Sequence, residues 1–563
     1  MSTLERVVID DSRATLLHCL LYWERQQPDR VYLTQPLGDG NVVRYTWREV
    51  GDQVRRMAAH LRSLDLPTGS KVAIYGKNSA HWIMADLAIW MAGHVSVPLY
   101  PTLNAETAEY VLEHSDAKLL FIGKLDGKAD SWNLVKEIIP RQLPCISLPM
   151  APSSDATSWQ DIQRSVEPLQ DFHLPVPEQL ATIMYTSGST GLPKGVMHSF
   201  TTMMQVARRV ESQFDMGRQD RFLSYLPLAH AAERAMIETI SLYIGCQVFF
   251  AHDLKSFTED LRRASPTFFF SVPRLWTKFQ QGIGEKVSPQ VQRYLLRLPI
   301  IKGVVRRQLL EKLGLAQVRI AITGSAPLPA SIIEWYRSLG LELLEGYAMT
   351  ENFGYSHVNR PGAVRIGYVG SAQPGVECRI DENGEVLVRS PGTMLGYYKN
   401  PEKTAEDIRA DGFLRTGDMG EIDEAGRLRI TGRVKDLFKT SKGKYIAPVP
   451  IEQKLGESPL VEVVCVGGGV LPQPAGLLML SEEYRQAPNR AELGRELEDL
   501  LVRVNVGLEP HEKLAFLAVI REPWTMENGL LTPTLKIRRQ QIEACYAEKF
   551  ERWEAQHKAV VWE

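Results

Sequence analysis

One glycine- and hydroxyl-rich stretch decides how this chain is interpreted. Residues 185–196 read Tyr185-Thr186-Ser187-Gly188-Ser189-Thr190-Gly191-Leu192-Pro193-Lys194-Gly195-Val196, directly after the apolar run 180–184. The glycines let backbone amides approach an anion closely, while the hydroxyls add donors and Lys194 adds positive charge. The stretch predicts a strand followed by a polyphosphate-binding loop, although no Gly-x-x-x-x-Gly-Lys-Ser/Thr pattern runs through it. The alternative is a Ser/Gly-rich surface linker, which rarely has a preceding strand and a Pro-Lys-Gly ending.

These residues resemble the phosphate-loop signature of the adenylate-forming acyl-activating superfamily, which includes acyl-CoA synthetases, luciferases and the adenylation domains of peptide synthetases. The match runs without a gap from Tyr185 to Val196. The resemblance implies a large N-terminal domain of several sheets flanked by helices, followed by a small mobile C-terminal α+β domain. It also implies that the phosphates of ATP are held by Thr186, Ser187, Gly188, Ser189, Thr190, Gly191 and Lys194.

Composition limits the classes of protein that remain. A chain of 563 residues is too long for one core and implies at least two domains. The net charge of -2 gives no general attraction for nucleic acid, so we expect no nucleic-acid partner. The 6 cysteines are scattered without Cys-x-x-Cys spacing, which argues against a structural zinc and a disulfide framework and favours a reducing compartment.

The N-terminal sequence does not resemble a secretory signal. Acidic residues precede the short apolar patch 16–23, whereas a signal peptide places positive charge before a longer apolar run. The best candidate for a membrane span, residues 87–100, is interrupted by Gly93 and His94. We therefore expect a cytoplasmic location.

Apolar runs alternate with amphipathic stretches, as in residues 71–75, 79–91 and 95–99. This alternation is typical of α/β folds with mostly parallel sheets. Further runs of the strand type occur at 118–122, 267–272, 318–323 and 341–344. After residues 427–433 the sequence becomes short, charged and glycine-containing, which predicts a boundary. We expect an AMP-binding domain with the acyl pocket over 1–434 and a mobile domain with the catalytic lysine over 435–563.

Two further segments of the superfamily's active site follow in order. Gly324-Ser325-Ala326-Pro327-Leu328 comes after the predicted strand 318–323, where small residues let a backbone lie flat against an adenine or an acyl carbonyl. Glu345-Gly346-Tyr347-Ala348-Met349-Thr350-Glu351 offers an aromatic ring, a hydroxyl and a carboxylate. By resemblance, Tyr347 stacks on the purine, Thr350 reaches phosphate and Glu351 holds Mg²⁺. Without the resemblance, Tyr347 would be a packed aromatic and Glu351 a solvated charge. The resemblance assigns the ATP/AMP-binding residues Gly324, Ser325, Ala326, Glu345, Gly346 and Tyr347.

A carboxylate and a guanidinium flank the hairpin predicted around residues 423–426. Asp418 is suited to accept hydrogen bonds from ribose hydroxyls, and Arg433 to bind the ribose or the α-phosphate. The alternative is an ordinary Asp–Arg surface pair, which contributes little. The resemblance places the interdomain hinge at Lys435.

A lysine near the C-terminus completes the resemblance. Lys536 lies in Leu531-Thr532-Pro533-Thr534-Leu535-Lys536 and matches the superfamily's mobile catalytic lysine. Such a cation lowers the barrier when a carboxylate attacks an α-phosphate, because both groups are negative. On its own, a lysine in a basic tail would usually face solvent. Arg538 and Arg539 are expected to be supporting or surface charges.

Three segments resemble those of long-chain fatty acid CoA ligases in particular. Residues 226–233 resemble a histidine motif that places His230 beside the acyl carboxylate; the alternative is a satisfied structural histidine. Residues 271–276 resemble the segment that carries a gating tryptophan, here Trp276, for which a buried core aromatic is an equal alternative. Residues 438–448 resemble a loop in which Gly443 lets the pantetheine arm of CoA pass close to the backbone.

A basic stretch, residues 291–312, mixes apolar residues and cations at roughly helical spacing. One interpretation is a peripheral contact with an anionic membrane, at the inner membrane face. Because Pro299 and Gly303 are expected to break it, a solvated helical hairpin is the favoured interpretation.

Together these features predict an enzyme that uses ATP, Mg²⁺ and CoA to convert a fatty acid, expected to be of long chain, into acyl-CoA, AMP and pyrophosphate through acyl-AMP. Two alternatives remain open. The acyl group could pass to an acyl carrier protein, or acyl-AMP could be the product. The chain could also be an inactive ATP-binding scaffold.

Overall fold

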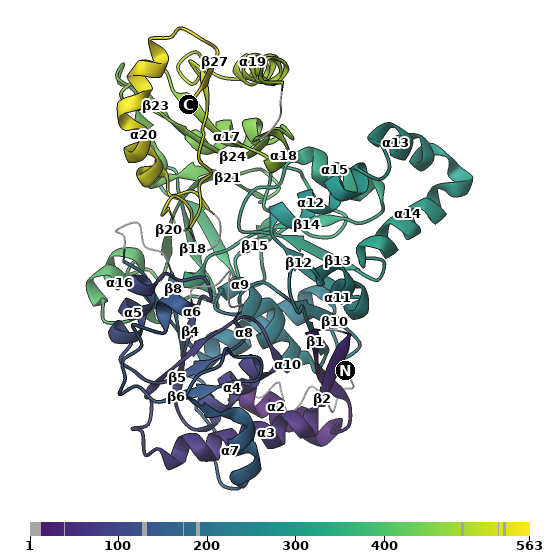
Figure 1. Cartoon of the computed structure of the whole chain (residues 1–563), viewed down its shortest axis with the longest axis vertical. Coiled ribbons are helices and arrows are strands. Elements are labelled where there is room, and N and C mark those ends of the chain that lie inside the picture. Colours follow the sequence, from purple (N-terminus) through teal and green to yellow (C-terminus); the bar gives the residue numbers. More distant parts are fainter. Residues whose placement is uncertain are drawn as a thin grey trace.

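The computed structural model describes residues 13–38, 40–125, 132–172, 174–186, 192–485, 489–526, 528–532 and 536–563. They form a large body and a small body, each with hydrophobic clusters of its own. The small body contains the sheets from residue 438 onward and lies at the top of Figure 1. The 3₁₀ turn Val434–Asp436 connects the two bodies along the chain. The α/β class expected from the sequence is confirmed.

An eight-stranded sheet forms the centre of the large body, in the order β19, β9, β8, β4, β3, β5, β6 and β7. The strands from β8 to β7 pair in parallel, and β9 pairs antiparallel with both β8 and β19. The strands predicted at 71–75 and 95–99 are confirmed. The bounds are β3 (Lys71–Tyr75), β4 (Val95–Leu99), β5 (Ala117–Ile122), β6 (Cys145–Ser147), β7 (Thr157–Ser158), β8 (Leu180–Thr186), β9 (Lys194–Ser199) and β19 (Gly396–Tyr397).

Three smaller sheets complete the large body. The first is β10 (Arg221–Ser224), β11 (Gln247–Phe250), β1 (Val31–Gly38) and β2 (Asn41–Thr46). The second is β12 (Phe268–Ser271), β13 (Ile320–Thr323), β14 (Leu343–Tyr347), β15 (His357–Val358) and β16 (Ser371–Ala372), of which the first three are parallel. The third is β17 (Glu377–Ile380), β18 (Glu385–Arg389), β20 (Leu414–Ile422) and β21 (Leu428–Arg433). The predicted hairpin around residues 423–426 joins β20 to β21.

Helices cover these sheets (Figure 1). In the large body they are α2 (Leu16–Gln26), α3 (Trp47–Ser63), α4 (Ala80–Met91), α5 (Ala105–His114), α6 (Trp132–Val135), α7 (Trp159–Ser165), α8 (Phe200–Phe214), α9 (Ala231–Glu233), α10 (Ile240–Ile244), α11 (Phe257–Ala264), α12 (Pro273–Gly284), α13 (Pro289–Arg297), α14 (Pro299–Leu313), α15 (Ala330–Ser338) and α16 (Pro401–Asp407). A 3₁₀ turn, Thr350–Asn352, and a π-helix, Arg234–Thr239, complete the set.

The small body combines two antiparallel strands, a four-stranded sheet and four helices. The strands are β22 (Phe438–Lys439) and β23 (Tyr445–Ile446), then β24 (Val461–Gly467), β25 (Ala475–Leu480), β26 (Leu517–Val519) and β27 (Val560–Trp562). The helices are α17 (Pro448–Gly456), α18 (Glu482–Arg485), α19 (Arg490–Val506) and α20 (Arg539–Glu554).

Helix α4 belongs to the main hydrophobic cluster of the large body. All of its residues are buried, because it packs against α3 and contacts β1, β3 and β4. A helix that is apolar around its whole circumference is stable only in such a position. It begins where the sequence predicts, since the Ser79 hydroxyl caps it by accepting a hydrogen bond from the Trp82 amide (3.2 Å).

A buried ionic network ties the π-helix to the central sheet. The Arg234 guanidinium pairs with Asp86 of α4 and with Glu238 (3.2 Å), and it donates to the hydroxyls of Ser96 and Thr182. The side chains of Arg234, Asp86 and Glu238 are completely buried. Burial and the Asp86 charge raise the pKa of Glu238 well above its usual value. One cation therefore serves two carboxyl groups, one of which holds its proton.

The basic stretch forms a helical hairpin, α13–α14, which projects from the large body (Figure 1). Pro299 starts the second helix, as expected, because proline fits the first helical turn. The predicted break at Gly303 is wrong, since Gly303 lies inside α14. Val291, Tyr294 and Val304 are exposed on the hairpin. No helix of the described residues is long and apolar enough to cross a membrane.

Replacing Arg234 by methionine is expected to destabilise the large body strongly. The change leaves Asp86 and Glu238 buried without a cation, which costs about 3–5 kcal/mol. The measurement is the free energy of unfolding from a urea titration. The control is Arg389→Met, which breaks the exposed 2.6 Å pair with Glu377 and should cost less than about 1 kcal/mol. Equal losses in the two variants would contradict the role of the network.

Candidate active site

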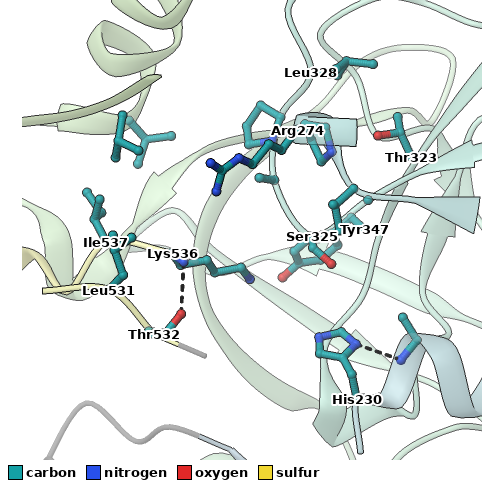
Figure 2. Close-up of a pocket in the computed structure, with 18 of the residues that line it drawn as sticks. His230, Arg274, Thr323, Ser325, Leu328, Tyr347, Leu531, Thr532, Lys536 and Ile537 are labelled. Carbon is teal, nitrogen blue, oxygen red and sulfur yellow. Dashed lines mark hydrogen bonds between the residues drawn. The ribbon is translucent and has the colours of Figure 1, made fainter. Parts of the chain in front are cut away.

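A cavity of about 3120 Å³ lies between the large body and the small body. The carboxyl ends of the parallel strands β8, β12, β13 and β14 open onto it, which is where open α/β sheets commonly bind ligands. Figure 2 shows Lys536 of the small body extending into this cavity toward the large body. The wall of the cavity is therefore shared by both bodies.

Most of the residues predicted for the site line this one cavity. They are Thr186, Lys194, His230, Gly324, Ser325, Ala326, Glu345, Gly346, Tyr347, Thr350, Glu351, Asp418, Arg433, Lys435 and Lys536. The loop residues Ser187, Gly188, Ser189, Thr190 and Gly191 lie outside the described residues. Segments separated by up to 350 positions in the sequence thus converge on one space.

Asp418 is held from two sides at the wall of the cavity. Tyr347 Oη donates a hydrogen bond to its Oδ2 (2.6 Å), and Arg433 Nε pairs with its Oδ1 (2.9 Å). The hairpin explains the second contact, because Asp418 of β20 lies opposite Arg433 of β21. Asp418 is buried, so the pair differs from an ordinary surface pair in having a fixed, desolvated carboxylate.

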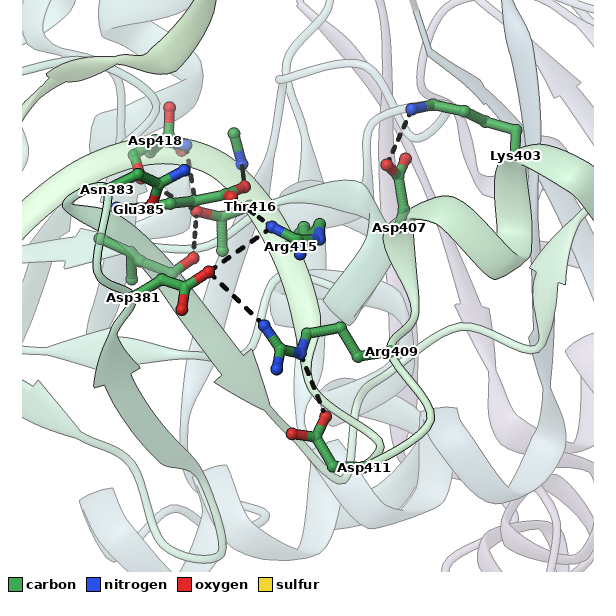
Figure 3. A network of polar contacts seen from close by, with 12 residues as sticks. Asp381, Asn383, Glu385, Lys403, Asp407, Arg409, Asp411, Arg415, Thr416 and Asp418 are labelled. Atoms are coloured by element: carbon green, nitrogen blue, oxygen red, sulfur yellow. Dashed lines mark hydrogen bonds and ion pairs between the residues drawn. The ribbon is translucent and has the colours of Figure 1, made fainter.

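The turn that carries Asp418 is fixed by Glu385, which the sequence did not single out (Figure 3). One carboxylate oxygen of Glu385 accepts from the Gly417 amide (3.0 Å), and the other pairs with Arg415 (3.0 Å). Gly417 has a φ of 70°, a conformation that favours glycine. No local motif shows this contact, since Glu385 belongs to the neighbouring strand β18.

Lys194 and Glu351 both contact the side chain of Tyr397. Tyr397 Oη lies 2.9 Å from Glu351 Oε1 and 3.0 Å from Asp407 Oδ2, and Lys194 Nζ lies 4.2 Å from the centre of the ring. Lys194 also pairs with Asp407 (3.8 Å). Burial lowers the pKa of Lys194, while Glu351 and Asp407 oppose the shift. Sequence reasoning missed Tyr397 and Asp407, because β19 joins β9 only through tertiary pairing.

Lys536 occupies a closed turn of backbone. Its amide donates to Thr532 Oγ1 (3.0 Å), and its carbonyl accepts from the Thr532 amide (2.8 Å). The surrounding walls and the charge of Arg433 lower the pKa of Lys536, and Asp418 opposes the shift. Lys536 is exposed at the wall of the cavity, and the charges of Arg433 and Asp418 are close enough to influence its pKa.

His230 caps the first turn of α9 and faces the cavity. Its Nδ1 accepts from the Ala232 amide (3.2 Å), so the proton of the neutral ring lies on Nε2. Burial, helped by the positive charge of Lys536, lowers the pKa of His230 to about 4. The ring is therefore neutral at physiological pH and can donate one hydrogen bond from Nε2.

Trp276 and Gly443 do not line the cavity. The Trp276 ring is fully buried, 5.3 Å from Phe269 and 5.0 Å from Tyr336 between ring centres. The structure thus places Trp276 in the core, the alternative that the sequence left open. Gly443 lies in the turn between β22 and β23 with a φ of 79°. The small body presents Lys536 to the cavity, and not Gly443.

Arg538 and Arg539 differ in position. Arg538 is exposed, as expected for a surface charge. Arg539 is buried, donates to both oxygens of Glu452 (2.7 and 2.8 Å) and pairs with Asp436 (3.5 Å). Arg539 therefore links the connecting turn of residues 434–436 to the start of α20, close to Lys536.

Part of the cavity wall, called the apolar branch below, consists of hydrophobic side chains. Val210 and Phe214 of α8 and Met236 of the π-helix line it, together with Phe270 at the end of β12. All four side chains are buried. The cavity thus joins a charged region around Lys536 to a region suited to a hydrocarbon chain.

Glu345 is a buried acid that the sequence assigned only as part of a longer segment. Burial raises the pKa of Glu345 to about 7, although the amides of Gly367 and Leu328 oppose the shift. Its Oε2 finds no hydrogen-bond partner among the described residues. The group therefore changes charge near physiological pH.

Glu345→Gln should change the pH dependence of stability. The folded protein binds more protons at Glu345 than the unfolded chain between about pH 4.5 and pH 7, so the stability of the parent falls as pH rises through this window. The loss reaches about 3 kcal/mol above pH 7. As pH rises from 4.5 to 7, the melting temperature of the parent should therefore fall relative to that of Glu345→Gln. If the exposed control Glu424→Gln showed the same pH-dependent change in melting temperature relative to the parent, the raised pKa of Glu345 would be contradicted.

Comparison with known proteins identifies the family of this chain. Residues 21–398 match the AMP-binding enzyme family, and residues 435–557 match the AMP-binding enzyme C-terminal domain. The chain is 30% identical to the long-chain-fatty-acid–CoA ligase FadD15 of Mycobacterium bovis, over 94% of each chain. It is 31% identical to fatty acyl-CoA synthetase A of Dictyostelium discoideum, over 91% of this chain and 86% of the relative.

A solved structure shares the fold. The adenylation domain of a carboxylate reductase from Mycobacterium chelonae superimposes with a TM-score of 0.80 at 21% identity, covering 98% of this chain and 93% of that one. The two sequence matches cover both bodies of the structure, and the superposition extends over nearly the whole fold. The chain therefore belongs to the AMP-binding enzyme family.

Proposed function

We propose that this protein activates a fatty acid with ATP, through an acyl-adenylate, and transfers the acyl group to the thiol of CoA. The observation that carries the proposal is the single cavity that joins Lys536, Asp418 and Glu351 to the apolar branch beside α8. The names of the curated relatives support it, since those proteins are fatty acid CoA ligases. The protein would then be an AMP-forming acid–thiol ligase.

The nucleotide would lie against β14 and the β20–β21 hairpin. Tyr347 offers its ring to the purine, and the fixed carboxylate of Asp418 can accept from the two ribose hydroxyls. Arg433 already contacts Asp418 and can donate to the ribose or the α-phosphate. The segment from Thr186 to Lys194 would bind the outer phosphates, because its lysine reaches the same region as Glu351.

A magnesium ion fits this arrangement only together with ATP. The described residues contain no cluster of three or more metal-ligating side chains, and Glu351 is the carboxylate expected to hold the ion. Mg²⁺ commonly binds one or two carboxylates and takes its remaining ligands from phosphates and water. When bound, the ion would neutralise phosphate charge. Tyr397, which contacts one oxygen of Glu351, would orient that carboxylate.

The first step needs positive charge between two anions. The fatty acid carboxylate attacks the α-phosphate, the bond to the bridging oxygen breaks and pyrophosphate leaves. Lys536, which lines the cavity and interacts electrostatically with His230 and Asp418, would stabilise the developing charge. The neutral His230 would donate from Nε2 to the acyl carboxylate and fix its orientation.

The second step requires a different arrangement of the small body. We infer that rotation about Lys435 withdraws Lys536 and brings Gly443 to the cavity, where the CoA thiol attacks the acyl carbonyl and AMP leaves. The present structure supports the first arrangement, since Lys536 lines the cavity and Gly443 does not.

Acids from acetate to oleate should differ strongly in pyrophosphate release with MgATP, because only longer chains fill the apolar branch. Mass spectrometry of the products is expected to show long-chain acyl-CoA, formed only when CoA is present. Acyl-AMP that accumulates regardless of CoA would point to a carrier-protein acceptor. Absence of turnover with every acid would contradict the proposal and favour a scaffold.

Lys536→Ala should reduce acyl-AMP formation by about 10²- to 10³-fold, the effect of removing one group that stabilises transition-state charge. The measurement is ATP–pyrophosphate exchange driven by fatty acid. Reaction of preformed acyl-AMP with CoA should change much less, and the melting temperature should stay the same. The matched control is the exposed neighbour Arg538→Ala. Full exchange activity in the lysine variant would remove Lys536 from the mechanism.

A further inference from the structure

An ion pair joins the two bodies across the cavity. Arg274, near the start of α12 in the large body, donates from Nη2 to Glu462 Oε1 on β24 of the small body (2.6 Å). Both residues line the cavity, and Figure 2 shows the Arg274 side chain extending into it. The two residues lie 188 positions apart in the sequence, so no local motif indicates the contact.

Glu462 is held in place by its own body. Its second oxygen accepts from Arg485 Nη2 (2.5 Å), and Arg485 Nε donates to the Leu480 carbonyl (2.9 Å). The Glu462 side chain is 19% exposed, whereas that of Arg274 is 50% exposed. The fixed, partly buried carboxylate of Glu462 on the small body thus forms an ion pair with the more exposed guanidinium of Arg274 on the large body. Such an acceptor loses little side-chain entropy when the pair forms.

The pair is present in the arrangement that places Lys536 in the cavity. In this arrangement Lys536 influences the pKa of His230 and is itself influenced by Asp418. Because Arg274 and Glu462 belong to different bodies, a rotation at Lys435 that withdraws Lys536 would separate them. The contact therefore stabilises one arrangement relative to the other.

We propose that Arg274 and Glu462 form an interdomain latch that holds Lys536 in the cavity and so favours the first of the two steps. They are positioning residues, because they act through the placement of Lys536 and contact no reacting atom. The inference rests on the proposed function for its kinetic consequence. Its structural consequence, a bias between two arrangements, can be measured independently.

The exposure of the Arg274–Glu462 pair sets how strongly it favours one arrangement of the two bodies over the other. Partly exposed ion pairs change an equilibrium by about two- to fivefold, and salt weakens them. Arg274→Gln should therefore slow fatty acid-dependent ATP–pyrophosphate exchange by about two- to fivefold. It should leave the reaction of preformed acyl-AMP with CoA unchanged or faster. Arg274→Lys, which keeps the charge, should restore most of the exchange rate.

The matched control is Lys278→Gln, one turn further along α12. Lys278 is also exposed and lines the same cavity, and no ion pair of Lys278 is present among the described contacts. Loss of the positive charge of Lys278 should leave the ratio of the ATP–pyrophosphate exchange rate to the rate of acyl-AMP reaction with CoA as in the parent. Equal slowing of both steps in Arg274→Gln, or no change in either, would overturn the latch.

A distance measurement tests the latch without any turnover. Spin labels on the exposed Cys545 of α20 and on a cysteine replacing the exposed Gln308 of α14 report the separation of the two bodies. Arg274→Gln, or 1 M salt in the parent, should raise the population of the second arrangement about two- to fivefold. A distribution unchanged from that of Lys278→Gln would overturn the proposal. If no acid supports exchange in the parent, the proposed function fails, and this measurement still decides the latch.

Discussion

The parallel pairing of strands in two sheets of the large body is the constraint on which the site depends. Parallel strands end at one edge, so the segments after β8, β12, β13 and β14 are brought to one space even though they are far apart in the sequence. The segments after the strands supply glycines, hydroxyls and charges, and β14 itself supplies Glu345, Gly346 and Tyr347. Lys536, in contrast, comes from the small body.

The local patterns of the sequence were sufficient for much of the fold. The strands at 71–75 and 95–99 and the start of α4 agree with the structure because apolar runs and a serine cap are local signals. Gly303 was read as a break, yet it lies within α14. A single glycine costs a helix only about 1 kcal/mol, and neighbouring residues outweigh it.

The candidate site was predictable only where its residues form motifs. Tyr347, Asp418 and Lys536 lie in such motifs and line the cavity. Tyr397, Glu385 and the Arg274–Glu462 pair reach it through strand pairing or contact between the bodies, which no short stretch of sequence encodes. Trp276 lies in a matching motif, but the motif did not indicate whether its ring faces the cavity or the core.

The π-helix at residues 234–239 has a consequence for how the family could vary. A π-turn holds one more residue than an α-turn, so it is equivalent to a one-residue insertion in a helix that otherwise continues from α9 to α10. Each residue turns an α-helix by about 100°. Deletion of Ala235 would change the direction in which Met236 points while Arg234 kept its place. The shape of the apolar branch beside Met236 therefore depends on one extra residue in this helix as well as on the side chains of its wall.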